Sequence, residues 1–88
     1  MTPRALEMID RMLQAASPAD YGITVGKAQN IAADLRQDLS SIRGEVLQAG
    51  LAPNLRAIET LISDLCRERS DKADVLSRLH SAIYALKY

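Results

Sequence analysis

Cysteine and histidine are the side chains here best suited to nucleophilic or acid–base chemistry, and each occurs once, as Cys66 and His80. A thiol and an imidazole act together only within hydrogen-bonding distance. Along one continuous helix their separation in sequence corresponds to about 21 Å. A break in that helix would let them approach, so a Cys66–His80 dyad is the alternative. We expect instead a half-buried thiol and a surface imidazole, with no catalytic residues.

Carboxylates spaced four residues apart offer a second kind of chemistry, at Asp34 with Asp38 and at Asp64 with Glu68. On a helix each pair shares one face and could hold a hard cation through its oxygens. A solvated acidic face is the commoner role of such a pair. One cysteine and one histidine do not make a structural zinc site. We therefore expect no metal site.

The segment from Gly22 to Lys27 superficially resembles a glycine-rich phosphate loop that leads into a helix. It lacks the spacing of a nucleotide-binding loop, and no strand is predicted before it. A capped helix start explains the same residues. The sequence thus predicts a protein that has no cofactor and is not an enzyme.

The spacing of apolar residues indicates helices throughout, with no alternation of strand length. Thr2 before Pro3 suits a helix start, and Gly50 followed by Pro53 suits a helix end. Near Asp71 either a new helix begins or one helix continues through. The predicted helices cover about 3–16, 25–49, 53–69 and 72–87. The alternative is that the last two form one continuous helix.

A heptad seam fills the second predicted helix and resumes after the turn at Gly50. Folding the chain back there pairs four apolar layers and brings Arg43 beside Glu59. The pairing fails only where Arg69 and Lys72 would enter the seam, so the chain should diverge there. The expected layers are Ala49–Leu55, Val46–Ile58, Ile42–Ile62 and Leu39–Leu65.

These patterns predict an all-α fold, a small three- or four-helix bundle around an antiparallel helical hairpin, with residues 1–88 forming a single helical domain. The first helix should cover the remaining apolar stripe. A parallel homodimer through the second helix is the alternative, because Asp38 of one chain would then meet Arg43 of the other.

Composition narrows the functional classes. The formal net charge is zero, with 11 basic and 11 acidic residues interspersed, so a nucleic-acid partner is not favoured. No apolar run is long enough for a membrane span or a signal peptide. A lone cysteine fits a reducing compartment, and we expect a cytoplasmic, bacterial protein.

Two groups of residues are candidates for binding a protein partner. Tyrosine is favoured at interfaces because it adds a large ring at low entropic cost. The apolar stripe of the second helix beyond the hairpin needs a cover, which the first helix or another chain could supply. The candidates are Tyr84, Tyr88, Tyr21, Ala28, Ile31, Ala32 and Leu35.

The sequence therefore favours a non-enzymatic protein–protein interaction module. We expect a small bacterial or phage/plasmid accessory protein that acts as a chaperone, adaptor or inhibitor of a protein partner, with self-association into a homodimer open. The alternative is a small dimeric helical DNA-binding transcriptional regulator, because the turn at Gly50 joins two helices.

Overall fold

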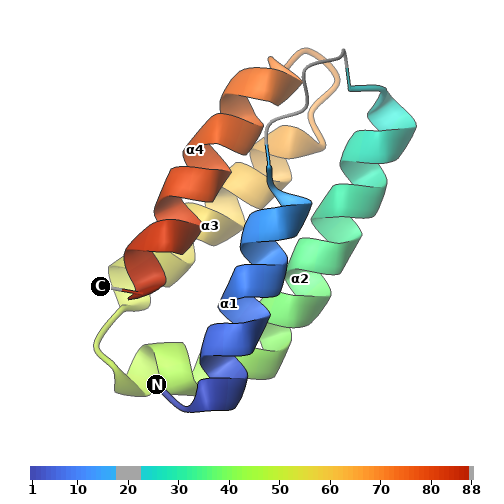
Figure 1. Ribbon diagram of the computed structural model, residues 1–88. Helices are drawn as coiled ribbons and strands as arrows, with labels where there is room; N and C mark the ends of the chain where they lie inside the picture. Colours follow the sequence, from blue (N-terminus) through green and yellow to red (C-terminus); the bar gives the residue numbers. More distant parts are fainter. Residues whose placement is uncertain (18–22, 88) are drawn as a thin grey trace.

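The computed structural model describes residues 1–17 and 23–87, and every regular element within them is a helix. Adjacent helices pack antiparallel (Figure 1), so the predicted all-α bundle around a helical hairpin is confirmed, with four helices. They are α1 (Pro3–Ala15), α2 (Val25–Gln48), α3 (Ala52–Leu65) and α4 (Lys72–Tyr84), which is followed by the 3-10 helix η1 (Ala85–Lys87).

The first two helices begin at threonine caps. The Thr2 hydroxyl accepts a hydrogen bond from the Ala5 amide at 3.2 Å, and that of Thr24 accepts one from the Lys27 amide at 3.1 Å. Each cap satisfies a backbone donor that has no partner inside the helix. Capping therefore fixes where α1 and α2 start.

The turn between α2 and α3 depends on Gly50. This residue has a φ of 76°, in the left-handed region that glycine adopts without steric cost. The Gly50 amide donates to the Leu47 carbonyl and the Leu51 amide donates to the Val46 carbonyl, both at 3.1 Å. These two bonds form a Schellman motif, which ends α2 and turns the chain back.

The last two helices are separate. α3 ends at Leu65, four residues before the predicted end, and α4 begins at Lys72. The Asp71 carboxylate caps α4 by accepting a hydrogen bond from the Asp74 amide at 3.2 Å. The continuous-helix alternative is wrong, and the predicted start near Asp71 is confirmed.

The early end of α3 keeps two cations out of the core. Arg69 is exposed in the turn, and the Lys72 ammonium donates to the Arg67 carbonyl and, at 2.6 Å, to the Ser70 hydroxyl. Burying two long cations on an apolar seam would require compensating anions. The chain avoids that cost by leaving the seam after Leu65.

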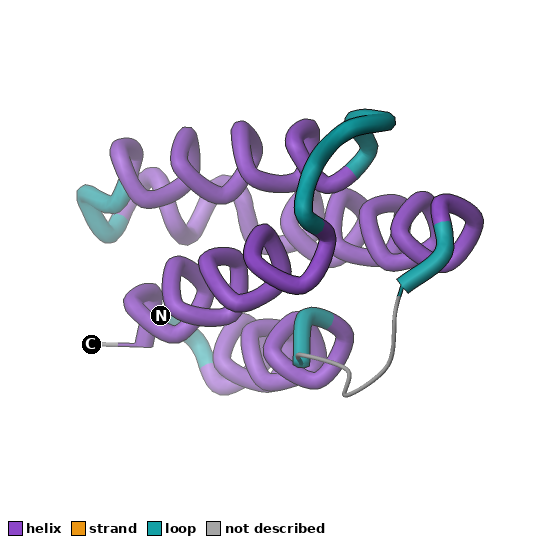
Figure 2. The backbone as a smooth tube through the Cα atoms, turned by 90° about the horizontal axis from the view of Figure 1, so that it is seen from above, coloured by secondary structure: helices purple, strands orange, loops and turns teal. Residues whose placement is uncertain are grey.

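The four helices close into a ring in which α1 packs against both α2 and α4, and α3 also packs against both (Figures 1 and 2). The radius of gyration is 12.3 Å, close to the roughly 12 Å expected of a compact domain of this length. One cluster of buried apolar side chains fills the centre. Among the described residues, no helix is long and apolar enough to cross a membrane.

Several seam positions differ from the prediction. α1 buries Ala5, Ile9 and Met12, and its C-cap residue Ala16 is also buried, whereas Leu6 is 37% exposed. The spacing of apolar residues predicts a stripe of Leu6, Ile9, Leu13 and Ala16 on this helix, with Ala5 and Met12 beside it. The helix is rotated relative to that stripe, so that Ala5 and Met12 are buried in place of Leu6. Three of the four hairpin layers lie in the core: Val46–Ile58, Ile42–Ile62 and Leu39–Leu65. The fourth is not buried as a pair, because Ala49 is exposed where α2 ends.

Candidate protein-interaction surfaces

Most of the predicted apolar stripe of α2 lies inside the bundle. Ala28, Ala32 and Leu35 have no exposed surface, and Ile31 is half-buried at the edge of the core. Because α1 and α3 pack against α2, the chain itself covers these side chains. The prediction that they form a partner surface therefore fails for three of the four residues, which are not accessible in this fold.

The predicted tyrosines have different outcomes. Tyr84, the last residue of α4, keeps 48% of its surface exposed. An exposed ring at the end of a helix can contact another protein, since tyrosine combines an apolar body with a polar tip. Tyr21 and Tyr88 lie outside the described residues.

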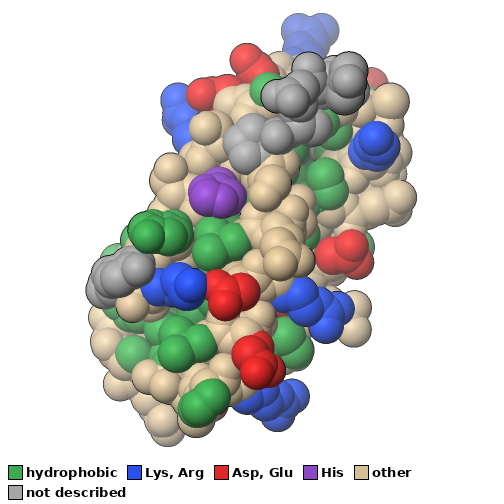
Figure 3. Space-filling model, in the orientation of Figure 1, with side chains coloured by type: hydrophobic (Ala, Val, Ile, Leu, Met, Phe, Trp, Pro, Cys, Tyr) green, Lys and Arg blue, Asp and Glu red, His purple; other side chains and the backbone are tan. Residues whose placement is uncertain are grey.

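Large apolar side chains are exposed mainly toward one end of the bundle. The chain begins at that end, α2 turns into α3 there, and α4 ends nearby (Figure 1). Figure 3 shows apolar side chains gathered toward it on the face formed by α1 and α4, among acidic and basic side chains. The exposed residues near this end are Met1, Leu6, Leu47 and Tyr84, while Val25 lies at the opposite end.

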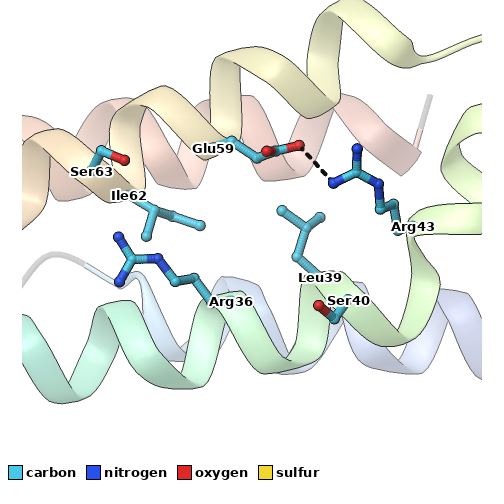
Figure 4. A pocket seen from close by; sticks show the side chains of 7 residues that line it. All are labelled: Arg36, Leu39, Ser40, Arg43, Glu59, Ile62 and Ser63. Atoms are coloured by element: carbon cyan, nitrogen blue, oxygen red, sulfur yellow. Dashed lines mark hydrogen bonds and ion pairs between the residues drawn. The ribbon is translucent and has the colours of Figure 1, made fainter.

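A groove runs between α2 and α3 (Figure 4). Its volume is about 260 Å³, many times the roughly 30 Å³ that one water molecule occupies in the liquid. Leu39 and Ile62, which are 5% and 1% exposed, close its floor. The walls carry polar side chains from both helices: Arg36, Ser40 and Arg43 from α2, and Glu59 and Ser63 from α3.

The charges of this groove do not balance. Arg43 pairs with Glu59 at 3.4 Å, as the hairpin predicted, and both side chains are about half exposed. Arg36 makes no hydrogen bond or ion pair with another described residue, and its guanidinium lies at the other end of the groove from Arg43 (Figure 4). The groove therefore carries two guanidinium groups but one carboxylate.

A second hollow lies beside the N-terminus, and two of the residues that line it bond to each other. Its lining includes Thr2 and Glu45. The Thr2 hydroxyl lies 2.9 Å and 3.0 Å from the two Glu45 carboxylate oxygens, and the Thr2 amide donates to one of them at 3.4 Å. A carboxylate at a helix N-terminus is favoured by the helix dipole. These contacts tie α1 to α2, so this site has a structural role.

The candidate chemical groups are not brought together. Cys66 and His80 are half-buried, and neither makes a hydrogen bond or an ion pair with a described residue. The prediction of a half-buried thiol holds, whereas His80 is less exposed than expected. No group of three potential metal ligands occurs among residues 1–17 and 23–87.

The acidic pairs considered as cation sites do not act as pairs, because one member of each makes its own ion pair with an arginine. Asp38 is 5% exposed and pairs with Arg11 of α1 at 3.5 Å between Oδ2 and Nε, whereas Asp34 is exposed. Asp64 pairs with Arg67 at 3.4 Å. Because Asp38 faces α1 and Arg43 faces α3, both charges of the parallel-dimer alternative are used within one chain.

Sequence reasoning missed the groove and the buried Asp38. The groove residues of α2 follow helical spacing, since Arg36, Ser40 and Arg43 recur every three or four residues on one face of the helix. The Arg43–Glu59 pairing indicated which helix lies beside this face. The sequence signal for the residues that line the groove was therefore the pairing register of the helical hairpin. Nothing in the spacing alone marked Asp38 as buried.

Comparison with known proteins adds no functional assignment: no family model, curated protein or solved structure matches this chain.

Proposed function

We propose that this chain is a non-enzymatic protein-binding module that acts as a chaperone, adaptor or inhibitor of a protein partner. The observation that carries the proposal is the gathering of exposed Met1, Leu6, Leu47 and Tyr84 toward one end of a bundle whose core is otherwise closed. Single exposed apolar side chains are ordinary, but their concentration in one region is typical of an interaction site.

The internal packing supports this proposal. The helices bury their seam against one another, and ion pairs link α1 to α2 and α2 to α3. A rigid scaffold of this kind presents exposed side chains without the entropic cost of ordering them on binding. The groove between α2 and α3 offers a separate contact, on the opposite side of the bundle from the face formed by α1 and α4.

The native mass of the tagged protein purified from its own cells tests the proposal, with every co-eluting chain identified. We expect a stoichiometric protein partner. Leu47→Ser or Tyr84→Ser should weaken that complex, because each removes an exposed apolar contact near one end. Val25→Ser is the matched control, since Val25 is equally exposed, at 49%, but lies at the other end.

The proposal is wrong if no partner co-elutes, or if both variants bind the partner as the parent chain does. The same preparation tests the DNA-binding alternative. A dimer that shifts a DNA probe in a salt-sensitive manner would favour that alternative, because phosphate contacts weaken as salt rises.

A further inference from the structure

We infer that the groove between α2 and α3 binds an acidic, aliphatic segment of the partner protein. A carboxylate of that segment pairs with Arg36, and an aliphatic side chain beside it lies over Leu39 and Ile62. This inference rests on the proposed protein-binding function and specifies the chemistry of the partner.

The shape of the groove suits a side chain. The groove has a volume of about 260 Å³ and lies between α2 and α3. The relative position of these two helices is set by the core side chains that they share. Leu39 and Ile62 make the floor apolar, and the methylene stems of Arg36 and Arg43 add apolar walls beneath their charged ends. An aliphatic side chain placed there would exchange water for carbon contacts on three sides.

The charge of the groove selects an acidic partner. Arg43 already has Glu59 at 3.4 Å, whereas Arg36 has no partner among the described residues. A guanidinium presents a planar fork of donors that matches a carboxylate. An incoming carboxylate on Arg36 would balance the two cations of the groove, whereas a basic segment would increase the imbalance.

The length of the groove suits a short segment. Arg36 and Arg43 lie seven residues apart on α2, which corresponds to about 10.5 Å along the helix. That length accommodates about three residues of extended chain or two turns of a helix. The hydroxyls of Ser40 and Ser63 line the groove and can bond the polar groups of such a segment.

Selection of random dodecapeptides displayed on phage against the full chain tests the inference. We expect the enriched peptides to carry Asp or Glu next to Leu, Ile, Val or Met. Synthetic versions should then be measured by fluorescence anisotropy. Arg36→Glu should weaken their binding by about tenfold, because it replaces attraction by like-charge repulsion.

Arg4→Glu is the matched control. Arg4 is exposed on α1, which packs against α2 and α4, and the variant makes the same change in net charge. We expect its effect to stay below about twofold, since distant surface charges are screened by salt. Ser40→Trp fills the groove without a charge change and should also block binding. Circular dichroism should show that all three variants keep the helical content of the parent chain.

Three results would overturn the inference. They are the enrichment of no peptide, the enrichment of basic peptides, and equal binding of the selected peptides to the parent chain and Arg36→Glu. The proposed function is tested separately by the co-purified partner. If that partner binds Arg36→Glu and Ser40→Trp as it binds the parent chain, the groove assignment fails while the protein-binding function stands.

Discussion

The guanidinium Nε of Arg11 lies 3.5 Å from the Oδ2 of Asp38, and this ion pair joins a largely exposed cation on α1 to a buried anion on α2. Asp38 is the one charged side chain that is buried among the described residues. A buried carboxylate is costly unless a countercharge or hydrogen bonds stabilise it. Arg11 supplies that countercharge while its other side remains in water.

Removal of Arg11 should destabilise the bundle more than replacement of the anion. Arg11→Ala leaves Asp38 buried without its partner, and we expect a loss of about 1–3 kcal/mol in the free energy of unfolding. Asp38→Leu removes the buried charge and lets Arg11 return to water, so its cost should be smaller. Urea denaturation of both single variants and of the double variant measures the coupling. An Arg11→Ala cost that persists in the Asp38→Leu background would show that the ion pair is not its cause.

The hairpin layers provide a second prediction. Leu39 and Ile62 are almost completely buried, and truncation of either to alanine should cost about 2–5 kcal/mol through lost contacts and a cavity. Asn30→Ala is the control, because Asn30 is exposed in the second turn of α2. Its effect should be within about 0.5 kcal/mol. Thermal melts that rank Asn30→Ala with the core variants would contradict the packing.

Substitution of two exposed glycines by alanine should change the free energy of unfolding in opposite directions. Gly50→Ala forces an alanine into a φ of 76°, and we expect a loss of about 1 kcal/mol or more. Gly44 lies in the interior of α2, and an added Cβ would meet no atom within 4 Å. Gly44→Ala should therefore stabilise the chain by about 0.5–1 kcal/mol. Denaturation midpoints that shift in the same direction for both variants would refute this assignment of the turn.

The register of the hairpin was predictable because it follows from the spacing of apolar residues. Steps of three and four place Ile42 opposite Ile62, and the same register brings Arg43 to Glu59. Gly50 and Asp71 marked the ends of helices for local steric and hydrogen-bonding reasons. These features depend on neighbours in sequence and on one simple pairing rule.

The face of a short helix was not predictable in the same way. In α1 two overlapping stripes are apolar, and packing against α2 and α4 selects the one that contains Met12 over the one that contains Leu6. Nor could spacing show that α1 covers Ala28 and Leu35, since a second chain would bury them equally well. The groove was missed because it needs the distance between α2 and α3, which no local pattern provides.

The start of α4 provides a fourth prediction. Asp71→Ala removes the side chain that accepts the Asp74 amide hydrogen bond and should cost about 0.5–2 kcal/mol. Asp71→Ser is the control, because a serine hydroxyl can accept the same bond. The unfolding free energy of the serine variant should remain near that of the parent chain. Equal losses for alanine and serine would indicate that the charge of Asp71, rather than capping, stabilises this turn.

The single cysteine and histidine provide the last prediction, which separates a binding module from an enzyme. Neither side chain makes a hydrogen bond or an ion pair with a described residue. We therefore expect Cys66→Ala and His80→Ala to bind the protein partner as the parent chain does. Cys66 packs against the core, so its truncation should lower the unfolding free energy by about 1 kcal/mol without changing the affinity. Circular dichroism and partner titration on the same samples distinguish the two effects. Loss of function in a variant that keeps its fold would mean that the thiol or the imidazole acts chemically, and the non-enzymatic proposal would then be wrong.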